Sequence, residues 1–400
     1  MEFDLASRTV YAAVTGSHAY GMANKDSDVD VRGVGIAPLA YYTGFLRKFK
    51  QADSVPDGFW EGVDAAIDDR CDPINEIERI QEGRPDERAL DIMGTTDIQI
   101  MDIRKFVELA ADANPNILEQ LFLPERCIIV LRRPFLGLRD MRDKFLSQKV
   151  RHSFAGYAHS QIKRIRGHRR WLQNPPKAPP SREDFGLPKE LPIPNDQFRA
   201  AESMIERRIQ EWMIDPDEEI PVTVLTRVRE AMTDLVASVA RDQDPEAAML
   251  RTAGHQLGFD ENFIMLLDKE RKYRQAKKDW KNYNTWLKER NSARAEMEAR
   301  WGYDTKHASH VVRLTRMCEE LLTFGQLRVD RKGIDADELL AIRGGAWTYD
   351  MLEEFADDID RRMDGLYGAP GCPLPREPDR KGIDRVCREI IQTHATKETF

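Results

Sequence analysis

Two aspartates spaced two residues apart, Asp28 and Asp30, follow a Gly16-Ser17 pair and are the residues best suited to chemistry. Alternate side chains of a strand share a face, so both carboxylates would project together. Two carboxylates held this close repel each other unless a cation lies between them, and Mg²⁺, a hard ion that prefers oxygen ligands, is expected, with Mn²⁺ as a substitute. Gly16 would let the backbone approach a phosphate, and Ser17 with the following amides would bind phosphate oxygens at a helix N-terminus.

A site with two metal ions needs a third carboxylate from a neighbouring strand, to hold the ion that activates an attacking hydroxyl. We predict Asp97, which begins the next strand with clear alternation. Asp102 is the alternative, but it precedes a helical stripe and suits an N-cap better. Either motif alone is common in turns and at strand edges; their order on two successive strands is what favours a metal site.

Short strands must position these groups. An apolar, β-branched run predicts a buried strand at residues 9–14, and period-two alternation predicts strands at 29–36 and 97–101. A helix is expected from Asp102 onward and a short one at 116–122. The acidic segment 45–92 has a weak pattern, which we interpret as a partly helical excursion from the sheet. Beyond about residue 135 helical periods dominate, at 135–172, 196–213, 222–242, 261–300, 305–325, 335–342, 348–364 and 380–394.

The pattern predicts an α+β protein with a small mixed-sheet domain at 1–134 and a larger all-helical domain at 135–400. A proline-rich insert at about 174–195 cannot be a helix interior. The 400 residues suffice for two domains, and a net charge of −8 means that a nucleic-acid partner would need a local basic face. We expect neither a secretory signal nor a membrane span. Five cysteines without a CxxC pair favour a reducing, cytoplasmic location.

The motif resembles the nucleotidyltransferase superfamily of DNA polymerase beta, whose signature is a hydrophobic residue with Gly-Ser, a gap, and then Asp-hydrophobic-Asp. It is similar in particular to a branch of predicted nucleotidyltransferases associated with RNA repair. The positions that fit this branch are Gly16, Ser17, Ala19, Tyr20, Gly21, Ala23, Ser27, Asp28, Asp30, Arg32 and Gly33. Further stretches that fit the same branch lie at 104–106, at 114–119, around Tyr157, Gln161 and Arg164, and at 306–313. The resemblance weakens over 45–95 and 174–300. The resemblance implies transfer of a nucleotidyl group from a nucleoside triphosphate such as ATP, by a sheet domain with a helical partner domain.

A second set of residues would bind the nucleotide. His18, Tyr20 and Arg32 lie beside the motif, and four further residues share one helix face: Lys306, His307, His310 and Arg313. A buried hydrogen-bonded histidine pair is the plainer alternative for the latter set, and a zinc pair would need a partner that the sequence does not offer.

Two basic segments are candidate RNA contacts. The first contains Lys163, Arg164, Arg166, Arg169 and Arg170, which would bind an RNA backbone or simply form a solvated helix face. The second, 269–290, interleaves aromatic residues with lysine and arginine. There a helix seam through Tyr273, Trp280 and Leu287 is favoured over RNA binding.

The sequence therefore predicts an enzyme that transfers a nucleoside monophosphate (NMP) from a nucleoside triphosphate (NTP), with an RNA end as the favoured acceptor. Nucleotidylation of a protein or small molecule is the alternative within the same chemistry, and a non-catalytic RNA-binding protein is the alternative outside it. No segment indicates a particular oligomeric state.

Overall fold

The computed structural model describes residues 3–24, 27–63, 97–210, 212, 232, 245–290 and 292–396. The chain divides into two compact units, Met1–Arg169 with Ala293–Phe400, and Arg170–Ser292. The predicted domain boundary after residue 134 stays a prediction. The two compact units divide the chain at other positions, because C-terminal helices pack against the sheet and belong to the same unit.

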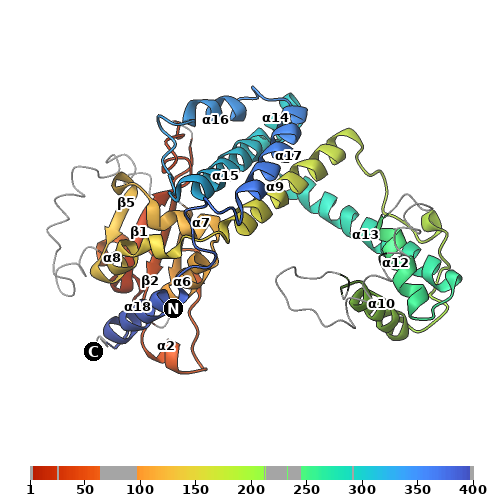
Figure 1. Cartoon of the computed structure of the whole chain (residues 1–400), viewed down its shortest axis with the longest axis horizontal. Helices are drawn as coiled ribbons and strands as arrows, with labels where there is room; N and C mark the ends of the chain where they lie inside the picture. The colour runs from red at the N-terminus through yellow and green to blue at the C-terminus, as the bar shows by residue number, and fades with distance from the viewer. Residues whose placement is uncertain are drawn as a thin grey trace. The chain divides into compact units, whose positions relative to one another are not determined.

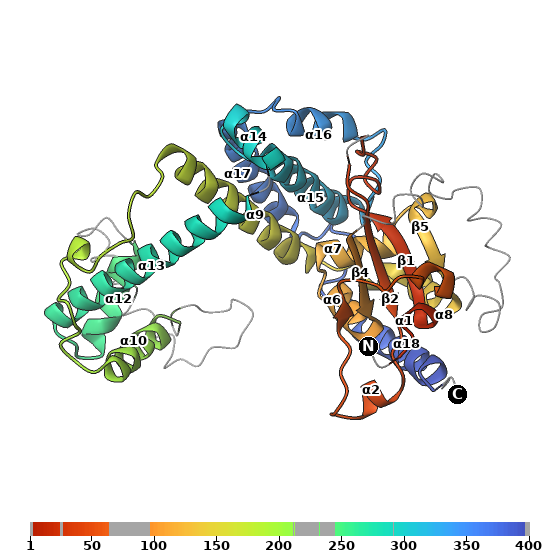
Figure 2. The same ribbon diagram turned by 180° about the vertical axis from the view of Figure 1, so that it is seen from behind.

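A five-stranded mixed sheet forms the N-terminal part of the first unit, with the order β3-β4-β2-β1-β5. Its strands are β1 (Thr9–Thr15), β2 (Asp30–Gly35), β3 (Gln51–Ala52), β4 (Asp97–Asp102) and β5 (Ile128–Leu131). Strand β2 runs antiparallel to β1 and parallel to β4 (Figure 2). With mostly helical structure after the sheet, the predicted α+β class is confirmed.

Strand β1 is buried along its whole length because both faces of the sheet are covered. Tyr11 and Ala13 belong to the larger core, and Ala12 and Val14 to a smaller core on the opposite face. The larger core is covered by α6 (Ile103–Ala111), α7 (Pro115–Leu118), η2 (Glu119–Phe122), α8 (Arg133–Asp140) and α18 (Arg380–His394). The smaller core is covered by α1 (Leu5–Arg8) and by loop residues such as Phe49 and Phe59.

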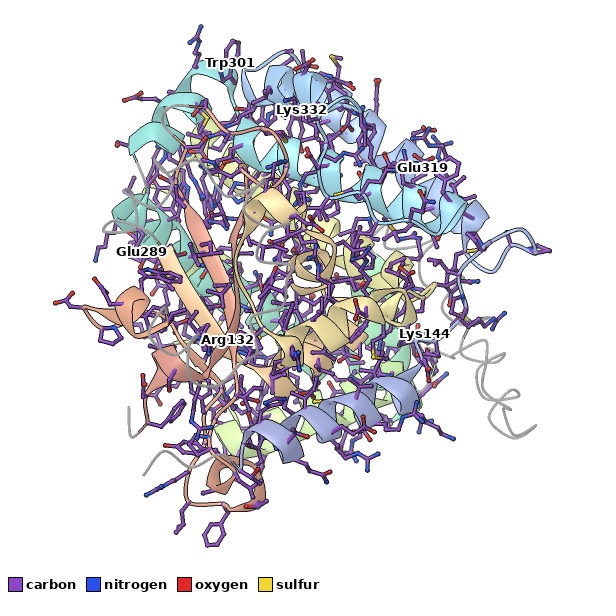
Figure 3. All side chains as sticks on the ribbon, turned by 90° about the vertical axis from the view of Figure 1, so that its left-hand side faces the viewer. Arg132, Lys144, Glu289, Trp301, Glu319 and Lys332 are labelled. Atoms are coloured by element: carbon purple, nitrogen blue, oxygen red, sulfur yellow. The ribbon has the colours of Figure 1, made fainter. Side chains whose placement is uncertain are left out.

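Helix α18 returns to the sheet from the far end of the chain. The Asp379 amide, at its N-cap, donates to the Lys144 carbonyl at 3.0 Å, and the Leu39 amide donates to the Ala395 carbonyl at 3.0 Å. The labelled Lys144 marks the first of these places in Figure 3. The amphipathic pattern Ile383, Cys387, Ile390 supplies the buried face of α18.

The rest of the first unit is a helical layer around α15 (Thr305–Phe324), which packs with α9 (Val150–Gln173) and α17 (Tyr349–Leu366) (Figure 1). Between these elements lie α14 (Ser292–Trp301) and α16 (Ala336–Arg343), and the sheet region also contains α2 (Ala40–Thr43), η3 (Glu125–Cys127) and η4 (Arg142–Phe145). The second unit contains η5 (Glu183–Phe185), α10 (Asn195–Gln210), α12 (Pro245–Gln256) and α13 (Glu261–Glu289).

Several predicted helix bounds are corrected. The helix expected over 135–172 is two helices, α8 and α9, because the chain turns at η4 between them. The helix expected over 261–300 is likewise divided into α13 and α14. Helix α12 and the short strands β3 and β5 were not predicted. The predicted helix at 222–242, apart from residue 232, and most of the acidic segment 45–92 lie outside the described residues.

The proline-rich stretch is non-helical as predicted, except for the short η5. The seven-residue seam on α13 is wrong at its last position, because Leu287 is 53% exposed. Tyr273 instead contacts the ring of Phe185, and Trp286 contacts Trp171. No helix in the described part of the chain is long and apolar enough to cross a membrane.

Candidate functional site

Gly16 ends strand β1 with a φ of +68°, a conformation that glycine adopts without strain. The chain then makes a tight turn in which the Tyr20 amide donates to the Gly16 carbonyl at 3.1 Å and the Met22 amide to the Ser17 carbonyl at 2.9 Å. No helix follows in the described residues of this turn, so the expected helix N-terminus at Ser17 is wrong. Phosphate contacts here would come from loop amides and the Ser17 hydroxyl.

Asp30 and Asp97 are direct neighbours across the parallel pair β2–β4. Paired residues of adjacent strands lie roughly 5 Å apart and point to the same face. Burial raises the pKa of Asp30; Arg32 opposes this shift, and Asp97 and Asp28 raise the pKa further. The carboxylates of Asp97 and Asp28 therefore both act on Asp30. A cation site shared by the three stays a prediction.

Asp102, the alternative third carboxylate, lies at the other end of β4, opposite Gly35. Its Oδ1 accepts hydrogen bonds from the amides of Arg104 at 3.0 Å and Lys105 at 3.4 Å, and its Oδ2 accepts one from the Tyr42 hydroxyl at 2.7 Å. The predicted N-cap role of Asp102 is confirmed.

Arg32 lies between the two strand carboxylates. Its Nη2 is 3.0 Å from Asp97 Oδ2 and 3.9 Å from Asp30 Oδ1, and its Nη1 donates to the Asp97 carbonyl at 3.1 Å. Among the described residues, no three histidine, cysteine or acidic side chains are already placed to hold a metal ion. The oxygen donors suit Mg²⁺, and an ion bound by Asp97 would replace its contact with Arg32.

A pocket of about 490 Å³ opens beside this end of the sheet. Roughly 300–1,000 Å³ is the usual range for sites that bind small molecules and cofactors. Its lining residues come from the turn, β2 and the helical layer, and they are Gly16, Ser17, Tyr20, Met22, Ser27, Asp28, Asp30, Arg32, Tyr157, Gln161, Arg164, Arg294, Lys306, His307, Ser309, His310, Arg313 and Arg343. In Figure 2 the red segment after β1 reaches towards α16, and the Tyr20 carbonyl accepts a hydrogen bond from the Arg331 amide at 3.1 Å.

The four residues predicted to share a face of α15 all line this pocket. Lys306 is close enough to Asp30 to lower its pKa. Burial, together with the charges of Arg313 and His307, holds the pKa of His310 well below its ordinary value. His310 is therefore neutral at pH 7 and serves as a hydrogen-bonding group rather than a cation.

Arg313 and Tyr20 are held by a buried network rather than directed freely into the pocket. The Arg313 guanidinium lies 3.5 Å from the centroid of the Tyr20 ring and donates to Glu119 Oε2 at 3.0 Å. The Tyr20 hydroxyl donates to Glu119 Oε1 at 2.5 Å. Their side chains thus join α15 to the turn that carries Gly16 and Ser17.

The other predicted contact residues are placed differently. His18 does not line the pocket: its Nε2 is buried without a hydrogen-bond partner among the described residues. Of the basic run, Arg164 lines the pocket, but its neighbours bind other parts of the protein: Arg166 pairs with Glu353, Arg169 stacks on Tyr349 and Arg170 pairs with Asp279. Lys163 is exposed. Three cations of this run already have partners within the protein. RNA binding by the run stays a prediction.

Sequence reasoning missed two arginines that line the pocket and one aspartate that contacts a lining residue. Arg294 and Arg343 lie on helices with mixed charge, where nothing local distinguishes them from solvated residues. Asp304 caps α15 and contacts His307, and an N-cap aspartate three residues before a histidine is a signal that could have found it.

Replacing Gly16 with alanine should impair the site through its geometry. A Cβ there would lie 2.9 Å from Asp30 Oδ2, so the carboxylate must move. A misplacement of about 1 Å at a catalytic group costs about 10²-fold in rate, and the positive φ adds about 1–2 kcal/mol of strain. Gly333→Ala is the control, since Gly333 has a φ of +75° but no described atom within 4 Å of the added Cβ. Transfer assays measure the activity of both variants, and thermal melting measures their stability. Equal losses of activity would contradict the close contact between Gly16 and the Asp30 carboxylate.

Comparison with known proteins gives one match. No curated protein and no solved structure matches the chain. The matched segment contains the Gly16-Ser17 turn and the three carboxylates, whereas α15, with Lys306 and His307, lies outside it. Residues 2–173 match the model of RlaP, the RNA repair pathway DNA polymerase beta family, and this confirms the resemblance that the Gly-Ser and Asp-Val-Asp motifs carry.

Proposed function

We propose that this protein transfers a nucleoside monophosphate from an NTP to an acceptor hydroxyl, with an RNA end as the favoured acceptor. The observation that carries the proposal is the pairing of Asp30 with Asp97 across neighbouring strands, beside the Gly16-Ser17 turn. The matched family supports the nucleotidyltransferase chemistry and the link to RNA repair.

The charge of the pocket suits a triphosphate. Besides the carboxylates, the pocket is lined by cationic side chains from the helices, supplied by Arg164, Arg294, Lys306 and Arg343. They would neutralise the charge of the phosphate oxygens and hold the triphosphate in place. Positioning and charge stabilisation of this kind supply most of the rate enhancement in phosphoryl transfer. Asp28, Asp30 and Asp97 would hold Mg²⁺ or Mn²⁺, which when bound supplies charge neutralisation and a lower pKa for the acceptor hydroxyl.

The acceptor is tested by incubating the protein with each α-labelled NTP, Mg²⁺ and total RNA. Label on RNA is the expected result and supports an RNA end as acceptor. Label on the protein or on a small molecule would identify that molecule as the acceptor instead of RNA, and nucleotidyl transfer would remain the reaction. An absence of label with every NTP, in Mg²⁺ and in Mn²⁺, would overturn the enzymatic proposal in favour of a binding role.

The third carboxylate is tested by comparing Asp97→Asn with Asp102→Asn. We expect Asp97→Asn to reduce transfer by about 10²-fold or more, as for loss of one electrostatic group in a preorganised site. Asp102→Asn keeps an N-cap and should retain activity, although loss of the hydrogen bond from the Tyr42 hydroxyl costs about 1 kcal/mol of stability. Single-turnover rates and melting curves measure both effects. If Asp102→Asn lost more activity than Asp97→Asn, Asp102 and not Asp97 would be the third carboxylate of the site.

A further inference from the structure

Asp304 and His307 form a close acid–histidine pair at the start of α15. Asp304 Oδ1 accepts a hydrogen bond from the His307 amide at 3.0 Å, and Oδ2 lies 2.6 Å from His307 Nδ1. Burial alone would raise the pKa of Asp304, but hydrogen bonds and charge from His307 outweigh it and hold the pKa at about 2. Asp304 is thus an ionised carboxylate with both oxygens committed to His307.

This pairing fixes which nitrogen of His307 faces the pocket. Nδ1 is occupied by Asp304, so Nε2, on the other side of the ring, is the nitrogen left to meet a ligand. The side chain is 13% exposed and lines the pocket beside Lys306, which in turn acts on Asp30. A carboxylate behind an imidazole holds the ring in place and stabilises its protonated form.

We propose that His307 is the general acid that protonates the leaving pyrophosphate, with Asp304 as its positioning residue. This inference rests on the proposed nucleotidyl transfer. The acceptor oxygen forms a bond to the α-phosphorus and loses its proton to water, while the bond from the α-phosphorus to the bridging oxygen breaks. The electron pair of that bond goes to the bridging oxygen, which takes the proton from His307 Nε2. Water then returns a proton to His307.

The other groups that face the pocket are poorly suited to this step. Arginine side chains do not give up a proton in proteins, which excludes all five arginines of the pocket, Arg32, Arg164, Arg294, Arg313 and Arg343. His310 is buried and neutral, and Asp30 is one of the carboxylates beside the metal site. Asp28 belongs to the same set of carboxylates, and the Tyr20 hydroxyl already donates to Glu119. Lys306 and Tyr157 remain as neighbours, but lysine and tyrosine serve in general acid–base catalysis less often than histidine. His307 is the group whose type matches general acid catalysis near neutral pH.

The decisive test varies the basicity of the leaving group. Single-turnover label transfer to whatever acceptor takes label in the total RNA reaction is measured with an α-labelled NTP and its β,γ-methylene and β,γ-difluoromethylene analogues. The methylene analogue releases the more basic bisphosphonate. With wild-type protein the rate should depend weakly on that basicity, because the proton is supplied in the transition state. His307→Gln should be slower by about 10²–10³-fold and depend more steeply on leaving-group basicity.

A purely structural or binding role would lower all three rates alike. Because the comparison of analogues is internal to each variant, partial unfolding of His307→Gln does not obscure it. Asp304→Asn keeps an N-cap but cannot stabilise the imidazolium, so it should slow transfer and steepen the dependence on leaving-group basicity in the same direction as His307→Gln. His255→Gln is the matched control, since His255 Nε2 contacts Glu261 at 2.9 Å within the second unit and does not line the pocket, and it should leave rates unchanged.

The two proposals fail in different ways. Absence of transfer by the wild-type protein would overturn the proposed function. Transfer by the wild-type protein with the same leaving-group dependence in His307→Gln would overturn the role of His307 alone.

Discussion

Asp30→Asn should reduce nucleotidyl transfer by at least about 10³-fold while the melting temperature at pH 7 is unchanged or higher. The carboxylate is half-buried and faces Asp97 and Asp28, and burial with these two charges raises its pKa. Its ionised form is therefore a cost to folding. Asparagine has the same shape and removes that cost together with one ligand of the proposed metal ions.

The contribution of Asp30 to stability should depend on pH in a defined direction. Because the folded-state pKa of Asp30 is raised above its unfolded value, protonation favours the folded state. This group makes the wild-type protein less stable as pH rises from its unfolded pKa through its folded pKa. Asp30→Asn should lack this contribution, so its advantage in melting temperature should shrink as the pH falls from 7 towards 4.

Melting curves at several pH values and single-turnover transfer in Mg²⁺ check both halves. Asp384→Asn is the control, because Asp384 is an exposed carboxylate on α18 far in sequence from the motif. Near wild-type transfer by Asp30→Asn would show that Asp30 is not a catalytic residue. A large fall in melting temperature would instead indicate that the Asp30 carboxylate stabilises the fold through Arg32.

The parts of the site that sequence reasoning found have local signals. An apolar, β-branched run marks β1, and alternation marks β2 and β4. The change of period after Asp102 separates an N-cap from a candidate ligand. The sequence indicates Asp97 because it begins the next clear strand. The parallel register that brings it level with Asp30 is a finding of the structure. The shared face of Lys306, His307, His310 and Arg313 is likewise a property of one helix.

The parts that were missed depend on contacts between distant residues. Strand β3 has two residues and β5 four, which is too short for a clear period. Arg166 looks like a free cation until its partner Glu353, 187 residues away, is known. Similarly, Tyr20 and Arg313 look like nucleotide ligands until Glu119 is placed between them. A helical pattern also cannot locate the turn between α8 and α9, since both flanking segments keep their apolar residues in the core.

The Arg313–Glu119 pair should be the most sensitive point of the helical layer to substitution. Arg313 is 1% exposed and Glu119 3% exposed, and their atoms are 3.0 Å apart. Arg313→Met would leave a buried carboxylate with the Tyr20 hydroxyl as its remaining hydrogen-bond donor of this network. Removing one partner of a buried ion pair costs about 3–5 kcal/mol, so the free energy of unfolding should fall by that amount.

The double variant Arg313→Met with Glu119→Gln separates the pair from the packing. It removes the orphaned charge and should recover at least half of the loss, because an uncharged amide still accepts from the Tyr20 hydroxyl. Arg388→Met is the matched control: Arg388 pairs with Asp384 on α18 with both side chains about two-thirds exposed, and the change should stay within about 0.5 kcal/mol. Urea unfolding measures all three variants, and transfer activity is not the readout because Arg313 lines the pocket. If Arg313→Met were no more destabilising than Arg388→Met, the buried network could not be what ties α15 to the Gly16-Ser17 turn, and that connection would have to rest on apolar packing alone.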